Sequence, residues 1–158
     1  MITYTPIGTI YTPFESIEGM PIQSKGAEGI EGKIVMNPEY VPALKDLDGF
    51  SHIILLYHFH KVNGYELQAK PFLDTEKRGM FAIRAPKRPN PIGISIVRLL
   101  SIDGNILHFK NADMLNETPL LDIKPYVPDF DIHENAKGGW TINRADNLDQ
   151  IKSDERFK

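Results

Sequence analysis

The most hydrophobic stretch of the chain, Ser51–His60, contains three histidines that could bind a metal ion. His52, His58 and His60 have the same parity, so on one strand their side chains would share a face. His58 and His60 would be neighbours there, a spacing that suits metal coordination. However, the stretch contains no Asp or Glu, and His52 would lie roughly 20 Å from His58. Hydrogen-bonded histidines at a strand end are the favoured interpretation, with a metal-dependent enzyme as an alternative.

A second group of polar side chains lies in Asn111–Pro119, between two apolar segments. Asp113, Asn116 and Thr118 are residue types that hold turns by bonding to the backbone. The same groups can bind ribose hydroxyls or an amino group of a ligand. The sequence leaves both interpretations open.

The stretch Gly79–Leu100 combines rigidity with positive charge. Its apolar ends predict two strands, Met80–Ile83 and the β-branched segment from Ile94 onward. Three prolines within six residues lie between them, and they exclude a helix interior and favour a stiff, extended crossing. The loop carries Arg84, Lys87 and Arg88. It is either a preformed binding loop or a proline-stiffened surface loop with solvated cations.

Several common catalytic patterns are absent from the sequence. The chain has no cysteine, which excludes disulfides, thiolate metal sites and Cys nucleophiles. It has no glycine-rich phosphate-binding motif. Ser95 follows Gly93 without the closing glycine of a nucleophile elbow, so we expect a structural serine. Asp122 and Lys124 share a parity in an extended segment, so they could pair with each other or line a site.

The composition is that of an ordinary globular protein. The 158 residues, 41% hydrophobic and 25% charged, predict one domain with a real core. No secretory signal and no membrane-spanning stretch is recognised, so we expect a cytoplasmic protein that does not enter a membrane. We also expect no bound metal, in line with the favoured interpretation of the histidines. The net charge of −3 gives no overall attraction to nucleic acid, which would need a local basic patch.

The predicted fold class is mainly β: a small β-barrel with one or two short helices and a polar C-terminal tail. The barrel domain is expected over residues 1–137 and the tail over 138–158, with Trp140 as its anchor. A short helix is expected after Asn37 as N-cap, and a tight hairpin turn at Asp103–Asn105. Open strand edges would favour a dimer. The expected strands are Tyr4–Ile10, Gly29–Met36, Ser51–His60, Tyr65–Phe72, Ile94–Ile102, Ile106–Lys110 and Leu120–Pro128.

Four segments carry a specific combination of residues. They are Phe81–Ser95 (FAIRAPKRPNPIGIS), Leu121–Tyr126 (LDIKPY), Gly49–His52 (GFSH) and Ile7–Phe14 (IGTIYTPF). This combination resembles the TsaA-like (YaeB/TrmO) family, and the resemblance extends over about residues 4–131.

The resemblance implies an S-adenosylmethionine-binding β-barrel, usually a homodimer, that methylates the N6 nitrogen of threonylcarbamoyl-adenosine beside the anticodon of tRNA. The family often has Arg at the position of Ile22 and Asp-Gly at Asn116-Glu117, and longer relatives carry a C-terminal domain that helps to hold tRNA. Carried over residue by residue, the cofactor contacts are Pro21, Ile22, Gln23, Phe59, His60, Arg84, Ile94, Asp113, Met114, Leu115 and Asn116. The basic residues expected to bind tRNA are Lys87, Arg88 and Lys124, together with Arg84.

This chemistry agrees with the residue types. Methyl transfer from a sulfonium needs alignment rather than a metal. A carboxylate at Asp113 would favour the sulfonium cation, and either His60 or Asp113 could accept the proton that the nitrogen loses. A non-catalytic module that binds S-adenosylmethionine or RNA is the main alternative function.

Overall fold

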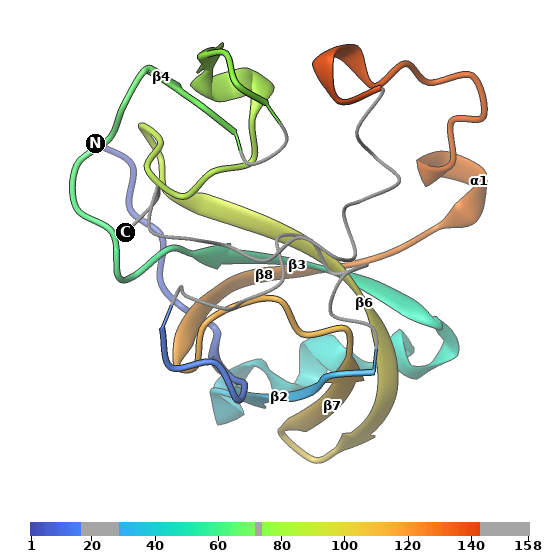
Figure 1. Ribbon diagram of the computed structural model, residues 1–158. Helices are drawn as coiled ribbons and strands as arrows, with labels where there is room; N and C mark the ends of the chain where they lie inside the picture. The colour runs from blue at the N-terminus through green and yellow to red at the C-terminus, as the bar shows by residue number, and fades with distance from the viewer. Residues whose placement is uncertain (17–28, 72–73, 143–158) are drawn as a thin grey trace.

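The computed structural model describes residues 1–16, 29–71 and 74–142, and its centre is a closed β-barrel (Figure 1). Six strands within these residues follow the order β1-β2-β7-β6-β3-β8, and every neighbouring pair is antiparallel. β1 pairs with both β2 and β8, so the sheet closes on itself. The strands are β1 (Gly8–Tyr11), β2 (Glu31–Met36), β3 (His52–His58), β6 (Ile92–Asp103), β7 (Ile106–Lys110) and β8 (Thr118–Pro125). The predicted small β-barrel is confirmed.

Strict alternation along the strands fills the barrel. On β6, Gly93, Ser95, Val97 and Leu99 are buried, and the residues between them are exposed. This period of two is that of a strand with one face on the core. The outward side chains of β3 are half-buried, so this strand is partly covered on its outer face as well. The largest fully buried side chains are Ile10, Ile34, Ile53, Leu55, Val97, Leu107, Phe109 and Leu120.

The predicted hairpin at Asp103–Asn105 is confirmed. β6 ends at Asp103, β7 begins at Ile106, and Gly104 has a φ of 60°, a conformation that glycine adopts without strain. Antiparallel pairing then places the start of β6 and the end of β7 together at the opposite end of the barrel. The ends of β1 and β3 and the starts of β2 and β8 lie there too. We call this the site end.

The helical segments are short. The predicted helix after Asn37 is two 3₁₀ segments, η2 (Pro38–Leu44) and η3 (Leu47–Gly49). Lys45 and Asp46 separate them, and Asp46 is in the left-handed region (φ 69°). The amide of Asn37 donates to the carbonyl of Pro6 (3.1 Å) instead of capping η2. The remaining segments are η4 (Met80–Ala82), α1 (Pro128–Asp131) and η5 (Gly139–Thr141). No described helix is long and apolar enough to cross a membrane.

The connection from β3 to β6 corrects two predictions. Of the expected strand Tyr65–Phe72, only β4 (Gln68–Ala69) forms among the described residues, paired with β5 (Arg78–Gly79). Met80–Ile83 was expected to be strand, but it contains η4, because Met80 turns inward to pack on Ala69 and Ala85. The connection is drawn in green above the barrel in Figure 1.

The proline-rich loop is bent rather than extended. The N–H of Arg88 donates to the carbonyl of Pro86 (2.8 Å), and that of Ile92 donates to Asn90 (2.7 Å). Such bonds between residues two apart close three-residue turns. Proline fixes φ but leaves ψ free, so a run of prolines can turn. The loop is therefore fixed in shape, as predicted, but its path is not straight.

Trp140 anchors the segment that follows the barrel. Its indole N–H donates to the carbonyl of Ala82 (2.8 Å), and the guanidinium of Arg78 lies 5.9 Å from its ring. The prediction that Trp140 attaches the tail to the body is confirmed. The remaining tail residues, 143–158, lie outside the described part of the chain, so the division into a domain and a tail stays a prediction.

Candidate functional site

Three polar side chains form a buried network at the site end of the barrel. The hydroxyl of Ser95 on β6 donates to Oδ1 of Asp113 (2.5 Å), and the hydroxyl of Tyr57 on β3 lies 2.8 Å from Ser95 Oγ. An ionised carboxylate can only accept hydrogen bonds. The chain of donation therefore runs from Tyr57 through Ser95 to Asp113. Ser95 is structural, as expected, but it holds the carboxyl group that the sequence had singled out.

Burial sets the protonation of this network. Tyr57 and Ser95 are buried, whereas Asp113 remains partly exposed. Loss of solvation raises the pKa of Asp113 to about 7, although the hydrogen bond from Ser95 and the charge of Arg84 favour the ionised form. Burial also raises the pKa of Tyr57, so its phenol stays protonated. Asp113 is thus a carboxyl group that ionises near neutral pH and is accessible to a ligand.

Two aromatic rings form a wall beside the network. Tyr57 and Phe59 meet edge to face, with ring centroids 5.7 Å apart. The N–H of Phe59 donates to the carbonyl of Pro91 (2.8 Å), which fixes Phe59 against the proline-rich loop. A Cβ at Gly93 would lie 2.7 Å from Tyr57 Cζ and 2.8 Å from Phe59 Cζ. Only glycine lets both rings lie directly on β6.

Gly93→Ala is therefore expected to lower the free energy of unfolding by about 1–3 kcal/mol, the usual cost of overpacking a core. The added methyl must displace the rings of Tyr57 and Phe59. Urea denaturation measures the loss. Gly79→Ala is the matched control, because Gly79 has a φ of −60° and open space around its Cβ position. Equal stability of the two variants would contradict the packing described here.

His60 and Arg84 lie near this network. The charge of Arg84 acts on both Asp113 and Tyr57, which places its guanidinium at the same end of the barrel. Burial lowers the pKa of His60, assisted by the positive charges of Lys61 and His58. The Nε2 atom of His60 is buried without a hydrogen-bond partner in the described part of the chain. A buried polar atom of this kind normally has a partner, so a bound ligand is a natural one.

The histidine stretch does not have the predicted geometry. β3 ends at His58, and His60 lies in the turn beyond it, so the two histidines do not share a strand face. His60 is hydrogen-bonded to the backbone of His58, as expected, but its Nε2 atom has no partner in the described part of the chain. Within the described residues, no three potential metal-ligating side chains come together.

In the turn after β7, some polar side chains hold the backbone and another is left for a ligand, so both interpretations of this turn from the sequence apply. The N–H of Thr12 donates to Asn116 Oδ1 (3.0 Å), and its hydroxyl donates to the carbonyl of Met114 (2.7 Å). Thr118 donates to a backbone carbonyl of the turn (2.6 Å). Asn116 and Thr118 therefore hold the backbone, and Asp113 remains directed toward Ser95 and solvent.

Glu117 is one of the positions at which this chain departs from the family pattern. It has a φ of 64°, in the left-handed region where a side chain costs about 1–2 kcal/mol and glycine costs nothing. The family often has glycine there.

Ile94 stands apart from the other candidate cofactor contacts. It precedes Ser95 on β6, so its side chain points out of the barrel, and it is 43% exposed. Only its backbone adjoins the network. Pro21, Ile22 and Gln23 lie outside the described residues.

The predicted tRNA-binding cations do not form one free patch. The guanidinium of Arg88 donates to the carbonyl of Ile83 (2.7 Å), so this residue fastens its own loop. Lys124 pairs with Asp122 (2.9 Å) on the surface of β8, which is one of the two arrangements that the sequence left open. Lys87 is half-buried.

Sequence reasoning overlooked Tyr57. The strand pattern could have identified it, because a tyrosine that faces the interior of a barrel needs a hydrogen-bond partner for its hydroxyl. Ser95 is the corresponding inward polar residue on the neighbouring strand, and Gly93 lies directly opposite Tyr57.

Comparison with known proteins identifies the protein family to which this chain belongs. The barrel matches the crystal structure of TrmO from Pseudomonas aeruginosa with a TM-score of 0.75 and 35% identity, over 89% of this chain and 62% of that one. Residues 9–132 match the model of the tRNA-methyltransferase O N-terminal domain. The chain belongs to this family, as the resemblance predicted.

Two relatives show the range of lengths in the family. A Pyrococcus abyssi protein named as a probable S-adenosyl-L-methionine-binding protein is 50% identical, over 99% of this chain and 85% of its own length. The human tRNA (adenine(37)-N6)-methyltransferase is 35% identical over 83% of this chain, but only 31% of its own length is matched. The chain thus spans most of the archaeal relative and about a third of the human enzyme.

Proposed function

We propose that this protein is an S-adenosylmethionine-dependent tRNA methyltransferase that acts on the N6 nitrogen of threonylcarbamoyl-adenosine next to the anticodon. The observation that carries the proposal is Asp113, a partly exposed carboxyl group held by Ser95 and facing the charge of Arg84. Family membership and the name of the human relative support the reaction class. A cytoplasmic location follows from a tRNA substrate and is part of the proposal.

The residues at the site end fit this cofactor. Asp113 supplies a negative charge for the sulfonium, and the fork of Arg84 suits the carboxylate of the methionine moiety. The ring of Phe59 offers an apolar face, and His60 Nε2 lacks a partner among the described residues. When bound, S-adenosylmethionine supplies a methyl group on a sulfonium that a nitrogen nucleophile can attack directly.

The protein's contribution is alignment and proton transfer. The bent proline-rich loop fixes the backbone that carries Arg84, and the Tyr57–Ser95 pair fixes Asp113. Such preorganisation of the reacting groups is a major source of rate enhancement. Of the two candidate proton acceptors, we favour Asp113, because a base with a pKa near the working pH is the most effective.

The test is mass spectrometry of tRNA nucleosides after incubation of the protein with S-adenosylmethionine. The substrate is tRNA that carries threonylcarbamoyl-adenosine, and tRNA lacking this modification is the control. One added methyl on the modified nucleoside supports the proposal. Tight cofactor binding by calorimetry without transfer would instead identify a non-catalytic binding module. The name of the Pyrococcus abyssi relative refers only to cofactor binding, which is the observation that favours this alternative.

We also propose that the protein is a homodimer. The open strand edges that the sequence predicted do not occur in the barrel, because β1 and β8 pair and close it. The outer face of β3 and β6 gives another reason. Ile54 lies opposite Ile96, and Leu56 lies opposite Ile94. The outward isoleucines of β6 at positions 92, 94 and 96 are about two-fifths exposed (41%, 43% and 39%), and a second copy would remove this apolar strip from water.

The dimer has a direct test. Light scattering is expected to give the mass of two chains for the natural protein and of one chain for Ile96→Asp, because a buried charge opposes association. Lys45→Asp is the control, since it changes an exposed residue outside this face. A monomeric mass for the natural protein would contradict the proposal.

A further inference from the structure

The outer wall of the barrel carries a group of basic residues that the site does not use. On β7, His108 lies opposite Lys33 of β2, and Lys110 lies opposite Arg98 of β6. All four side chains are exposed. Residues directly opposite across antiparallel strands have Cα atoms about 4.5–5.5 Å apart. We call these four residues, Lys33, Arg98, His108 and Lys110, the outer-wall patch.

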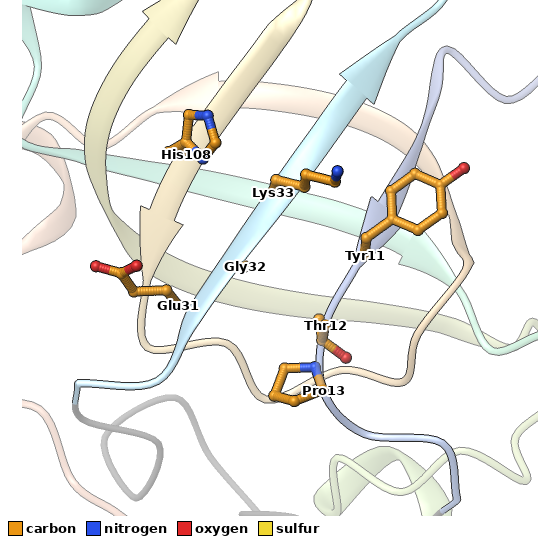
Figure 2. A pocket seen from close by; sticks show the side chains of 7 residues that line it. All are labelled: Tyr11, Thr12, Pro13, Glu31, Gly32, Lys33 and His108. Carbon is orange, nitrogen blue, oxygen red and sulfur yellow. The ribbon is translucent and has the colours of Figure 1, made fainter.

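The patch borders a shallow hollow. Figure 2 shows Lys33 between His108 and Tyr11, on three neighbouring strands. The Nζ atom of Lys33 lies 5.6 Å from the centroid of the Tyr11 ring, a cation–π contact that holds the amine over the surface. The hollow has a volume of about 300 Å³, and Gly32 lies at its centre.

No ion pair within the described residues neutralises the charges of the patch, although Glu31 lies directly opposite Lys110. Lys33, Arg98 and Lys110 take part in no ion pair there, whereas Lys124 and Arg78 are paired with acids. Glu31, opposite Lys110, is the acid that lies next to the patch. Set against the one negative charge of Glu31, the three fixed positive charges leave a positive excess of two on this wall of a chain whose net charge is −3. A segregated positive surface on an acidic protein is complementary to a polyanion.

The patch leads to the candidate site. Lys110 precedes Asp113 by three residues. On the other side, Tyr11 precedes Thr12, whose hydroxyl bonds to Met114 in the turn that follows Asp113. A strand of nucleic acid that lies along the patch therefore reaches the turn that carries the candidate proton acceptor.

We infer that the outer-wall patch binds the phosphate backbone of the tRNA substrate. This inference rests on the proposed function and deepens it, because it locates the RNA-binding surface on β2, β6 and β7 rather than on the proline-rich loop and β8. Contacts of this kind are ionic, and each releases condensed counterions from the RNA.

The salt dependence of tRNA binding provides the test. The natural protein is compared with Lys33→Gln/Lys110→Gln and with the control Lys45→Gln/Lys137→Gln, which makes the same change in charge at exposed residues outside the patch. Fluorescence anisotropy measures Kd for tRNA at several salt concentrations. The patch variant is expected to lower the slope of log Kd against log salt by about 2 and to weaken binding at least about tenfold at 0.1 M salt.

Calorimetry with S-adenosylmethionine is expected to give the same cofactor affinity for all three proteins, which shows that the variants fold. Equal slopes for the patch variant and the control would overturn the patch while leaving the proposed function intact. Failure of the natural protein itself to bind or methylate tRNA would overturn the proposed function. The two failures are therefore distinguishable.

Discussion

Asp113→Asn is expected to slow methyl transfer by about 10²- to 10⁴-fold, the usual contribution of a general acid or base. The substitution keeps the shape of the side chain and a hydrogen bond from Ser95, but the amide cannot accept the proton released by the substrate nitrogen. Single-turnover kinetics at saturating cofactor separate this effect from weaker cofactor binding.

Two variants make the assignment specific. Asp122→Asn removes a half-exposed acid that pairs only with Lys124 among the described residues, and we expect it to retain nearly the full rate. His60→Gln tests the other candidate acceptor. A large loss of rate in His60→Gln together with a normal rate in Asp113→Asn would transfer the role to His60.

The dependence of the rate on pH follows from the pKa of Asp113. The carboxyl group is neutral well below pH 7 and ionised above it, so the rate is expected to rise with pH and level off above about 7. Ser95 donates to the carboxylate and thereby favours the ionised form, so in Ser95→Ala the midpoint should move to higher pH. A midpoint that stays in place would show that Ser95 does not control this ionisation.

The sequence predicted the elements whose cause is local. Asp103–Asn105 contains the glycine that a two-strand turn requires, and the turn forms where expected. The shared parity of Asp122 and Lys124 allowed two arrangements, a pair or a site lining, and the pair is the one that forms. The strand predicted for Met80–Ile83 was wrong, because the conformation of this segment depends on a long-range contact. Met80 packs on Ala69 and Ala85, and no local sequence pattern reveals this packing.

The same distinction applies to the candidate site. Asp113 was recognised because its residue type and its turn are visible in the sequence. The groups that set its pKa, Ser95 on β6 and the charge of Arg84, lie far from it in the sequence and meet it only in the folded barrel. The outer-wall patch was missed for the same reason, because its residues lie between positions 33 and 110 and meet only through strand register.

Arg84→Ala is expected to weaken cofactor binding by about 2–5 kcal/mol, which is roughly 30- to several-thousand-fold in Kd, while the fold remains intact. Arg84 is exposed and follows η4, so its removal leaves no cavity in the barrel. The loss arises because the methionine carboxylate of the cofactor would be left without its charged partner in a site that also contains Asp113. Calorimetry with S-adenosylmethionine measures it.

The control variants separate charge from geometry. Lys77→Ala removes a cation from the same connection, where Lys77 is exposed, and should leave the affinity unchanged. Arg84→Lys keeps the charge but loses the planar fork, so we expect an intermediate affinity. If Arg84→Ala binds the cofactor as tightly as the natural protein, then Arg84 serves only to shift the pKa of Asp113. In that case the carboxylate of the cofactor must find its partner elsewhere in the chain.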